Sequence, residues 1–202
     1  MLISLRNALM AGKRLPYDAE VEYLQSSGTQ YIDTLVNADS NLSVEITMAN
    51  AGTPWSNVNP NGAIRITPRA RHHLNFNLNI QYYFCTGDTS TVTSIRPSDG
   101  EVFTYKVDAI AKTLSVNSST FSLPNDTFDL GMTYWLFGRN GMTSPYLGSL
   151  RIYSAKLWNG SILVRDFIPV RVGNVGYLYD RVSKRLFWNA GTGDFVLGPD
   201  KN

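Results

Sequence analysis

The feature that most constrains this fold is a long alternation of apolar and polar side chains over residues 74–84. Every second residue is apolar and the residues between are polar: Leu74, Phe76, Leu78, Ile80, Tyr82 and Phe84 against Asn75, Asn77, Asn79, Gln81 and Tyr83. A period of two places successive side chains on opposite faces of a β-strand. The pattern therefore predicts one strand over 74–84, with a buried face and a polar face.

Shorter β-rich runs lie on both sides of this segment in the chain, and turn signals separate them. The predicted strands cover 42–48, 101–109, 113–117, 133–138, 147–157, 162–170, 176–180 and 184–188. Asn159-Gly160 is typical of a two-residue hairpin turn, whereas residues 50–62 indicate a long exposed loop. Charged residues make up 17% of the chain, as in many β-rich proteins. We expect an all-β fold, an antiparallel sandwich of two sheets.

The first residues form a separate element. Leu2, Leu5 and Leu9 make a short apolar stripe at helical spacing, which Gly12 and Pro16 end. We expect an N-terminal helical arm over 1–20 and one domain over 21–202. The arm packs either on its own domain or on another subunit.

Charge and composition exclude several classes of protein. The net charge of +2 is too small to indicate nucleic acid as a partner. Cys85 is the single cysteine, so it has no disulfide partner in the chain, and we expect a buried thiol. No apolar stretch is long enough to span a membrane. The opening residues do not predict a signal peptide, because Arg6 interrupts their apolar run.

Two segments far apart in the chain carry a family resemblance. One is Gly28-Thr-Gln-Tyr-Ile-Asp-Thr34, with Val21-Glu-Tyr-Leu before it, and the other is Asn189-Ala-Gly-Thr-Gly193, with Val164-Arg-Asp-Phe-Ile-Pro169 upstream. Together they resemble the opening and closing segments of concanavalin A-like, LamG-type jelly-roll modules. Similar modules occur in tail-associated structural proteins of phages and prophages of gut bacteria. In them a Gly commonly follows the Ile-Asp-Thr, where this chain has Leu35.

The resemblance implies a jelly-roll sandwich and a non-enzymatic role in carbohydrate binding or adhesion, as part of a phage tail. The implied partners are a surface glycan of a bacterial or host cell and other virion subunits, which the arm would contact. The implied location is the virion, or the cytoplasm of the producing cell before lysis. The alternatives are a purely structural virion component without a sugar site and a glycoside hydrolase of the same fold.

The catalytic motifs of a hydrolase are not evident. A glycosidase needs two carboxylates that face each other across a sugar, and Glu20-Val-Glu22, which has this spacing, lies at the entry to the domain. His72 and His73 are the two histidines. On a strand they point to opposite faces, and we expect both to be exposed. The sequence predicts no catalytic residue, no cofactor and no metal site.

Carbohydrate binding has better support in the residues. Asn is disfavoured in strands, yet it recurs on one face of the run at 74–84. Amides donate and accept hydrogen bonds, as a sugar hydroxyl does, and an aromatic ring suits the apolar face of a sugar. The predicted site consists of Asn75, Asn77, Asn79, Gln81, Tyr83 and Trp55. The alternative is a solvated outer face. Among the other tryptophans we expect Trp135 in the core and Trp158 exposed, and the sequence leaves Trp188 undecided.

Overall fold

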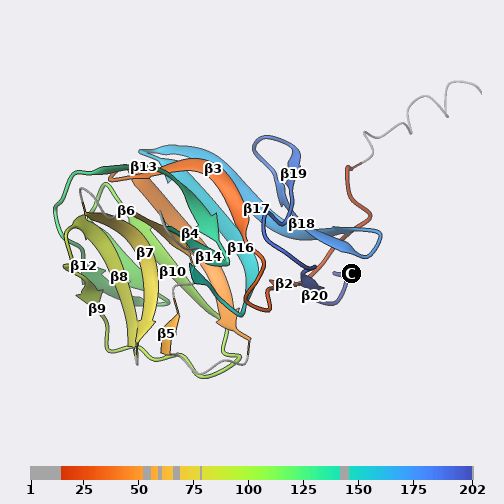
Figure 1. Cartoon of the computed structure of the whole chain (residues 1–202), viewed down its shortest axis with the longest axis horizontal. Helices are drawn as coiled ribbons and strands as arrows, with labels where there is room; N and C mark the ends of the chain where they lie inside the picture. Colours follow the sequence, from red (N-terminus) through yellow and green to blue (C-terminus); the bar gives the residue numbers. More distant parts are fainter. Residues whose placement is uncertain are drawn as a thin grey trace, which may run out of the picture.

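A computed structural model describes residues 15–51, 56–58, 61–65, 69–77, 79–141 and 146–201, and of residues 56–58, 64–65, 76–77 and 146 it describes the backbone alone. Within these ranges the protein consists of β-strands and has no helix (Figure 1). The strands form two sheets whose pairs are antiparallel, apart from the parallel pair β14–β6. The expected all-β class and the two-sheet arrangement are therefore confirmed.

The first sheet contains the longest strands. It runs in the order β12–β11–β10–β4–β16–β17–β18–β19; in addition, β1 pairs with β17, β2 pairs with β16, and β20 pairs with β2. Its strands are β1 (Ala19–Glu20), β2 (Leu24–Gln25), β4 (Leu42–Asn50), β10 (Phe103–Asp108), β11 (Thr113–Val116), β12 (Ser119–Ser122), β16 (Leu150–Asn159), β17 (Ile162–Val172), β18 (Val175–Asp180), β19 (Arg185–Phe187) and β20 (Val196–Leu197).

The second sheet runs in the order β15–β14–β6–β7–β8–β9. Strand β13 pairs with β3 and β6, and β5 pairs with β7. Its strands are β3 (Ile32–Asp39), β5 (Ser56–Val58), β6 (Gly62–Arg65), β7 (Ala70–Asn77), β8 (Asn79–Thr86), β9 (Thr91–Val92), β13 (Asp129–Leu136), β14 (Gly138–Gly141) and β15 (Tyr146–Leu147). Strand β5 lies inside the segment 50–62, which was predicted to be a loop throughout.

The alternating run at 74–84 is not one strand but parts of two. Strands β7 and β8 form an antiparallel pair in which Asn77 faces Asn79 and Asn75 faces Gln81. The prediction of a single strand was wrong because the apolar–polar pattern is symmetric about residue 78. Such a pattern keeps the same residues on the same face whether the chain runs straight or folds back.

The core lies between the two sheets. Inward side chains alternate along each strand, for example Val44 and Ile46 on β4 and Leu74 on β7, all fully buried. Burial of an aliphatic side chain of this size contributes about 1.5–3 kcal/mol. The apolar side chains of the 74–84 pattern that the structure describes, Leu74, Ile80, Tyr82 and Phe84, thus face the core. The described polar side chains between them face away from it.

A chain of hydrogen bonds crosses this core. His72 Nε2 donates to the carbonyl of Leu42 at 2.8 Å, so Nδ1 is the acceptor for the hydroxyl of Tyr82 at 2.9 Å. The Tyr82 hydroxyl lies 3.4 Å from that of Tyr134, which lies 3.3 Å from that of Tyr105. Each polar group of this apolar layer thereby gains a partner, which offsets the cost of burying it.

The two segments that carry the family resemblance lie side by side. Thr29 Oγ1 donates to the carbonyl of Thr192 at 2.9 Å, and the N–H of Ala190 donates to the carbonyl of Tyr31 at 2.8 Å. Strand β2 pairs with β20 next to them. Gly191 has an ordinary φ, yet a Cβ there would overlap the Thr29 carbonyl oxygen. The glycine is required by this close approach and not by its backbone conformation.

Residues 15–20 pack on the domain itself. The ring of Tyr17 lies 5.0 Å from that of Tyr179, edge to face, beside the buried side chains of Ile168 and Val170. Strand β1 continues this contact by pairing with β17. The predicted helical stripe of Leu2, Leu5 and Leu9 lies outside the described residues.

Two acidic residues near the C-terminal strands have arginine partners. Asp180 is fully buried, and its carboxylate lies 3.8 Å from the guanidinium of Arg165. Asp166 pairs with Arg181 at 2.9 Å. None of the described residues belongs to a helix long and apolar enough to cross a membrane.

Candidate functional site

The predicted amide face lies on the outer side of the second sheet. Asn75 and Gln81 are directly opposite each other on β7 and β8, and their side chains are partly exposed. Asn79 and Tyr83 are partly exposed on the same face. The backbone of Asn77 faces Asn79, but its side chain, like the whole of Trp55, lies outside the described residues. The structure thus brings four of the six predicted residues together through two neighbouring strands.

The pairing extends this face into a row of residues across five strands. Trp135 of β13 lies opposite Asp33 of β3 on one side and Gly62 of β6 on the other. Gly62 lies opposite His73 of β7, and His73 lies opposite Tyr83 of β8. Directly paired residues share a face of the sheet. The row places two aromatic rings and an imidazole beside the amide pair.

Gly62 forms a notch in the middle of the row. Its φ is +132°, and a Cβ there would overlap the carbonyl oxygen of His72 and the Cβ of His73. Only glycine fits a backbone that combines this φ with so close an approach. Arg139 is also paired with Gly62, and its guanidinium approaches His73 at 3.4 Å.

This contact determines the protonation of His73. A guanidinium can only donate, so Nε2 of His73 accepts from Arg139 and the proton of the neutral ring is on Nδ1. Burial lowers the pKa of His73 well below its usual range, and the positive charges of Arg139 and Arg71 lower it further. His73 is therefore a neutral ring at physiological pH, with Nδ1–H as its donor.

Three side-chain atoms on this face of β7 are buried without a hydrogen-bond partner among the described residues. They are Nε of Arg71, a donor, Nδ1 of His73, a donor, and Oδ1 of Asn75, an acceptor. These residues are spaced two apart on β7 and so lie on the same face. An unsatisfied buried polar group costs about 1–3 kcal/mol. A strand that keeps three of them side by side is destabilised for no structural gain.

Aromatic contacts hold the remaining side chains of the row in place. The ring of Tyr83 stacks on His73 at 4.7 Å, and the Arg71 guanidinium lies 4.8 Å from the same tyrosine ring. The ring of Trp135 stacks on Tyr31 at 3.9 Å. Such contacts restrict rotamers and leave a preorganised surface.

Two expectations about this region were wrong. His72 and His73 point to opposite faces as predicted, but both are fully buried, not exposed. Trp135 is partly exposed on the outer face, whereas its apolar neighbours suggested the core. The alternation that predicted the polar face at Asn75 also extends back to His73. This signal could have placed His73 on the same face as Asn75. Cys85, on the same face, is buried as expected, and burial raises its thiol pKa to about 11.

Two carboxylates face each other across a strand pair of the second sheet. Asp39 of β3 lies directly opposite Asp129 of β13, a pair that sequence spacing did not reveal. The amide nitrogen of Asn37 donates to Asp129 at 2.8 Å and contacts Asp39 at 3.5 Å. Asp39 also accepts from the backbone N–H of Asn41, so it caps a turn. Among the described residues no group of three His, Cys, Asp or Glu side chains is arranged to hold a metal ion.

No model of a protein family matches the chain, and no similar sequence is found among the curated proteins.

Proposed function

We propose that this protein is a non-enzymatic carbohydrate-binding or adhesion module, with its site on the outer face of β7 and β8. The observation that carries the proposal is a pair among the unpartnered buried atoms on β7. Nδ1–H of His73 needs an acceptor and Oδ1 of Asn75 needs a donor. A hydroxyl group accepts and donates at once, so the hydroxyls of a sugar match both requirements.

The surrounding side chains support the same ligand class. Asn79 and Gln81 offer further uncharged donors and acceptors, and Tyr83 offers an aromatic ring. Each hydrogen bond contributes only about 0.5–1.5 kcal/mol net, so a single site binds weakly. Many copies on one particle would raise the apparent affinity through avidity.

The wider context of the proposal is a concanavalin A-like jelly roll in a phage or prophage tail. Its support is the sequence resemblance, together with the hydrogen bonds that join the two resembling segments at Thr29 and Thr192. In this context the natural partner is a surface glycan of the cell to which the particle attaches, and the module acts outside the producing cell after lysis.

The test is a glycan array probed with the full chain and with a double variant, Asn75→Ala with Gln81→Ala. These two side chains face each other on the proposed site. The matched control is Ser115→Ala with Thr120→Ala, a facing pair on the first sheet whose hydroxyls lie 3.1 Å apart. We expect the site variant to lose at least about ten-fold in affinity and the control to bind as the parent does.

Two results would contradict the proposal. A parent chain that binds no glycan would favour the purely structural role in a virion. Release of reducing sugar by the parent, abolished by Asp129→Asn, would favour a hydrolase that uses the facing carboxylates of Asp39 and Asp129.

A further inference from the structure

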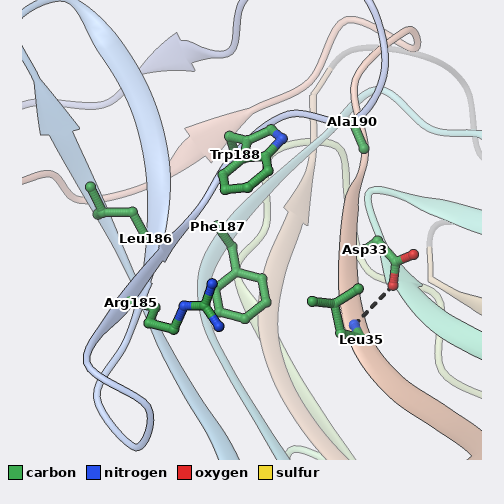
Figure 2. A pocket seen from close by; sticks show the side chains of 7 residues that line it. All are labelled: Asp33, Leu35, Arg185, Leu186, Phe187, Trp188 and Ala190. Atoms are coloured by element: carbon green, nitrogen blue, oxygen red, sulfur yellow. Dashed lines mark hydrogen bonds between the residues drawn. The ribbon is translucent and has the colours of Figure 1, made fainter.

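A second hollow lies away from the amide face, between β3 and the segment that follows β19. Figure 2 shows the side chains that line this pocket of about 180 Å³. Leu35 and Asp33 come from β3, and Phe187 and Trp188 face them from the other side, with Arg185 extending toward Phe187. In Figure 1, β19 is well separated from β8, so this pocket is distinct from the site proposed above.

Leu35 is an unusual residue to find at this position. Its φ is +57°, in the left-handed region, where a Cβ costs about 1–2 kcal/mol. Its side chain is nevertheless 63% exposed, so burial does not offset the strain. A strained backbone combined with an exposed apolar side chain is typical of a binding position.

Trp188 is the second exposed apolar residue of the pocket. Its side chain is 65% exposed, which is high for the largest apolar residue type. It also lines a neighbouring hollow of about 240 Å³, together with Tyr177 and Asn189. The indole therefore stands between two hollows and is available for stacking.

Two charged groups accompany these apolar walls. Asp33 Oδ1 accepts the backbone N–H of Leu35 at 2.8 Å, and a carboxylate has capacity for further donors. The guanidinium of Arg185 is an exposed donor. The pocket thus offers an acceptor and a donor beside an apolar surface made of Leu35, Phe187 and Trp188.

We propose that this pocket binds a 2-acetamido sugar, a hexosamine unit whose nitrogen is acetylated. The volume is below the ~300–1,000 Å³ of pockets for larger ligands and suits one ring with a small substituent. The sugar ring stacks on Trp188, and the acetyl methyl packs against Leu35 and Phe187. The amide N–H donates to Asp33, and its carbonyl accepts from Arg185.

The test compares two probes that differ only in the acetamido group, the methyl glycosides of N-acetylglucosamine and of glucose. Binding to the full chain is followed by tryptophan fluorescence and by the NMR signals of the indole N–H groups. We expect the acetamido probe to bind at least about ten-fold more tightly, because an unpaired polar site and an unfilled apolar pocket disfavour glucose. The indole signal that shifts should be the one absent in Trp188→Ala.

Leu35→Gly is the most informative variant. Glycine adopts a positive φ without strain, so the variant should fold at least as well as the parent while it loses the apolar wall. We expect Leu35→Gly and Trp188→Ala to weaken the acetamido probe at least about ten-fold. Trp158→Ala is the matched control, since Trp158 lies on β16, away from the pocket, and is partly exposed.

Equal affinity for the two probes, or a Leu35→Gly variant that binds as the parent does, would overturn the inference. The Asn75→Ala/Gln81→Ala variant separates the two sites, because it should leave the acetamido probe unaffected. Failure of one proposal is thereby distinguishable from failure of the other.

Discussion

At the scale of single residues, the two adjacent histidines have opposite surroundings and the same protonation. His72 faces the core, and burial lowers its pKa to about 4. His73 faces the other side, and burial with two nearby arginines lowers its pKa well below the usual range. Both rings are neutral in the folded state, whereas in the unfolded chain they titrate near 6.5.

This difference predicts a loss of stability in weak acid. Below about pH 6.5 the unfolded chain binds two protons that the folded protein does not, so the free energy of unfolding falls as the pH falls. At pH 5.0 we expect a loss of about 2 kcal/mol for each histidine relative to pH 8. Urea denaturation at the two pH values measures it.

Variants at each position assign the effect. His72→Gln keeps a donor and an acceptor in the core, and His73→Gln keeps an acceptor for Arg139. Each should remove about half of the pH dependence. A parent protein that is equally stable at pH 5.0 and pH 8 would show that the rings are protonated in the folded state.

At the scale of elements, the contact between the two resembling segments depends on Gly191. A Cβ at this position would overlap the Thr29 carbonyl, which belongs to the backbone and cannot rotate away. We expect Gly191→Ala to lower the free energy of unfolding by about 2–3 kcal/mol, the upper part of the range for overpacked sites. Thermal and urea unfolding measure the change.

Gly160 offers the matched comparison. It has a φ of +57° in the β16–β17 turn, and a Cβ there would meet open space. Gly160→Ala should therefore cost only the backbone strain, about 1 kcal/mol. Similar losses in the two variants would mean that the Thr29 segment moves away and that the close approach is not a constraint.

The strands were more predictable from sequence than their pairing. Local alternation is sufficient to place β10, β11, β17 and β18 and to assign the core face of β7. Local alternation cannot show that Asn77 pairs with Asn79, because the pattern is symmetric about position 78 of the sequence. Nor can it show that Gly62 lies between Trp135 and His73, since that row depends on partners far apart in the chain.

The candidate sites also differ in whether they depend on local sequence or on long-range contacts. The amide face was predictable because it is local to one segment. The pocket was not, because Leu35 and Trp188 meet only through the tertiary fold. The burial of His73 was equally hidden, because sequence shows which face a residue takes but not what covers that face.

At the scale of the whole molecule, the last residues close the first sheet. Gly198 and Lys201 donate backbone N–H groups to the carbonyls of Tyr23 and Glu20. Deletion of residues 196–202 removes this pairing and exposes Leu24, which is fully buried. We expect a loss of at least about 3 kcal/mol, which corresponds to a fall in Tm of about 6–12 °C.

The control for this deletion is Asp200→Asn. It removes the ion pair with Arg171 and keeps the strand, and an exposed pair of this kind contributes little to stability because solvent screens it. A truncated chain as stable as the parent would show that β20 is dispensable for the domain.

The pairing of residues 20–24 with residues 197–201 also determines how the molecule would bear a mechanical load. The paired residues are Glu20 with Lys201, Val21 with Asp200 and Leu24 with Leu197, and the two segments run antiparallel. A force that pulls residues 15 and 201 apart would therefore break these pairs one after another, starting at Glu20 and Lys201. It would not load all the pairs at the same time. The C-terminal strand would peel away at low force, while the two sheets behind it stayed under little tension.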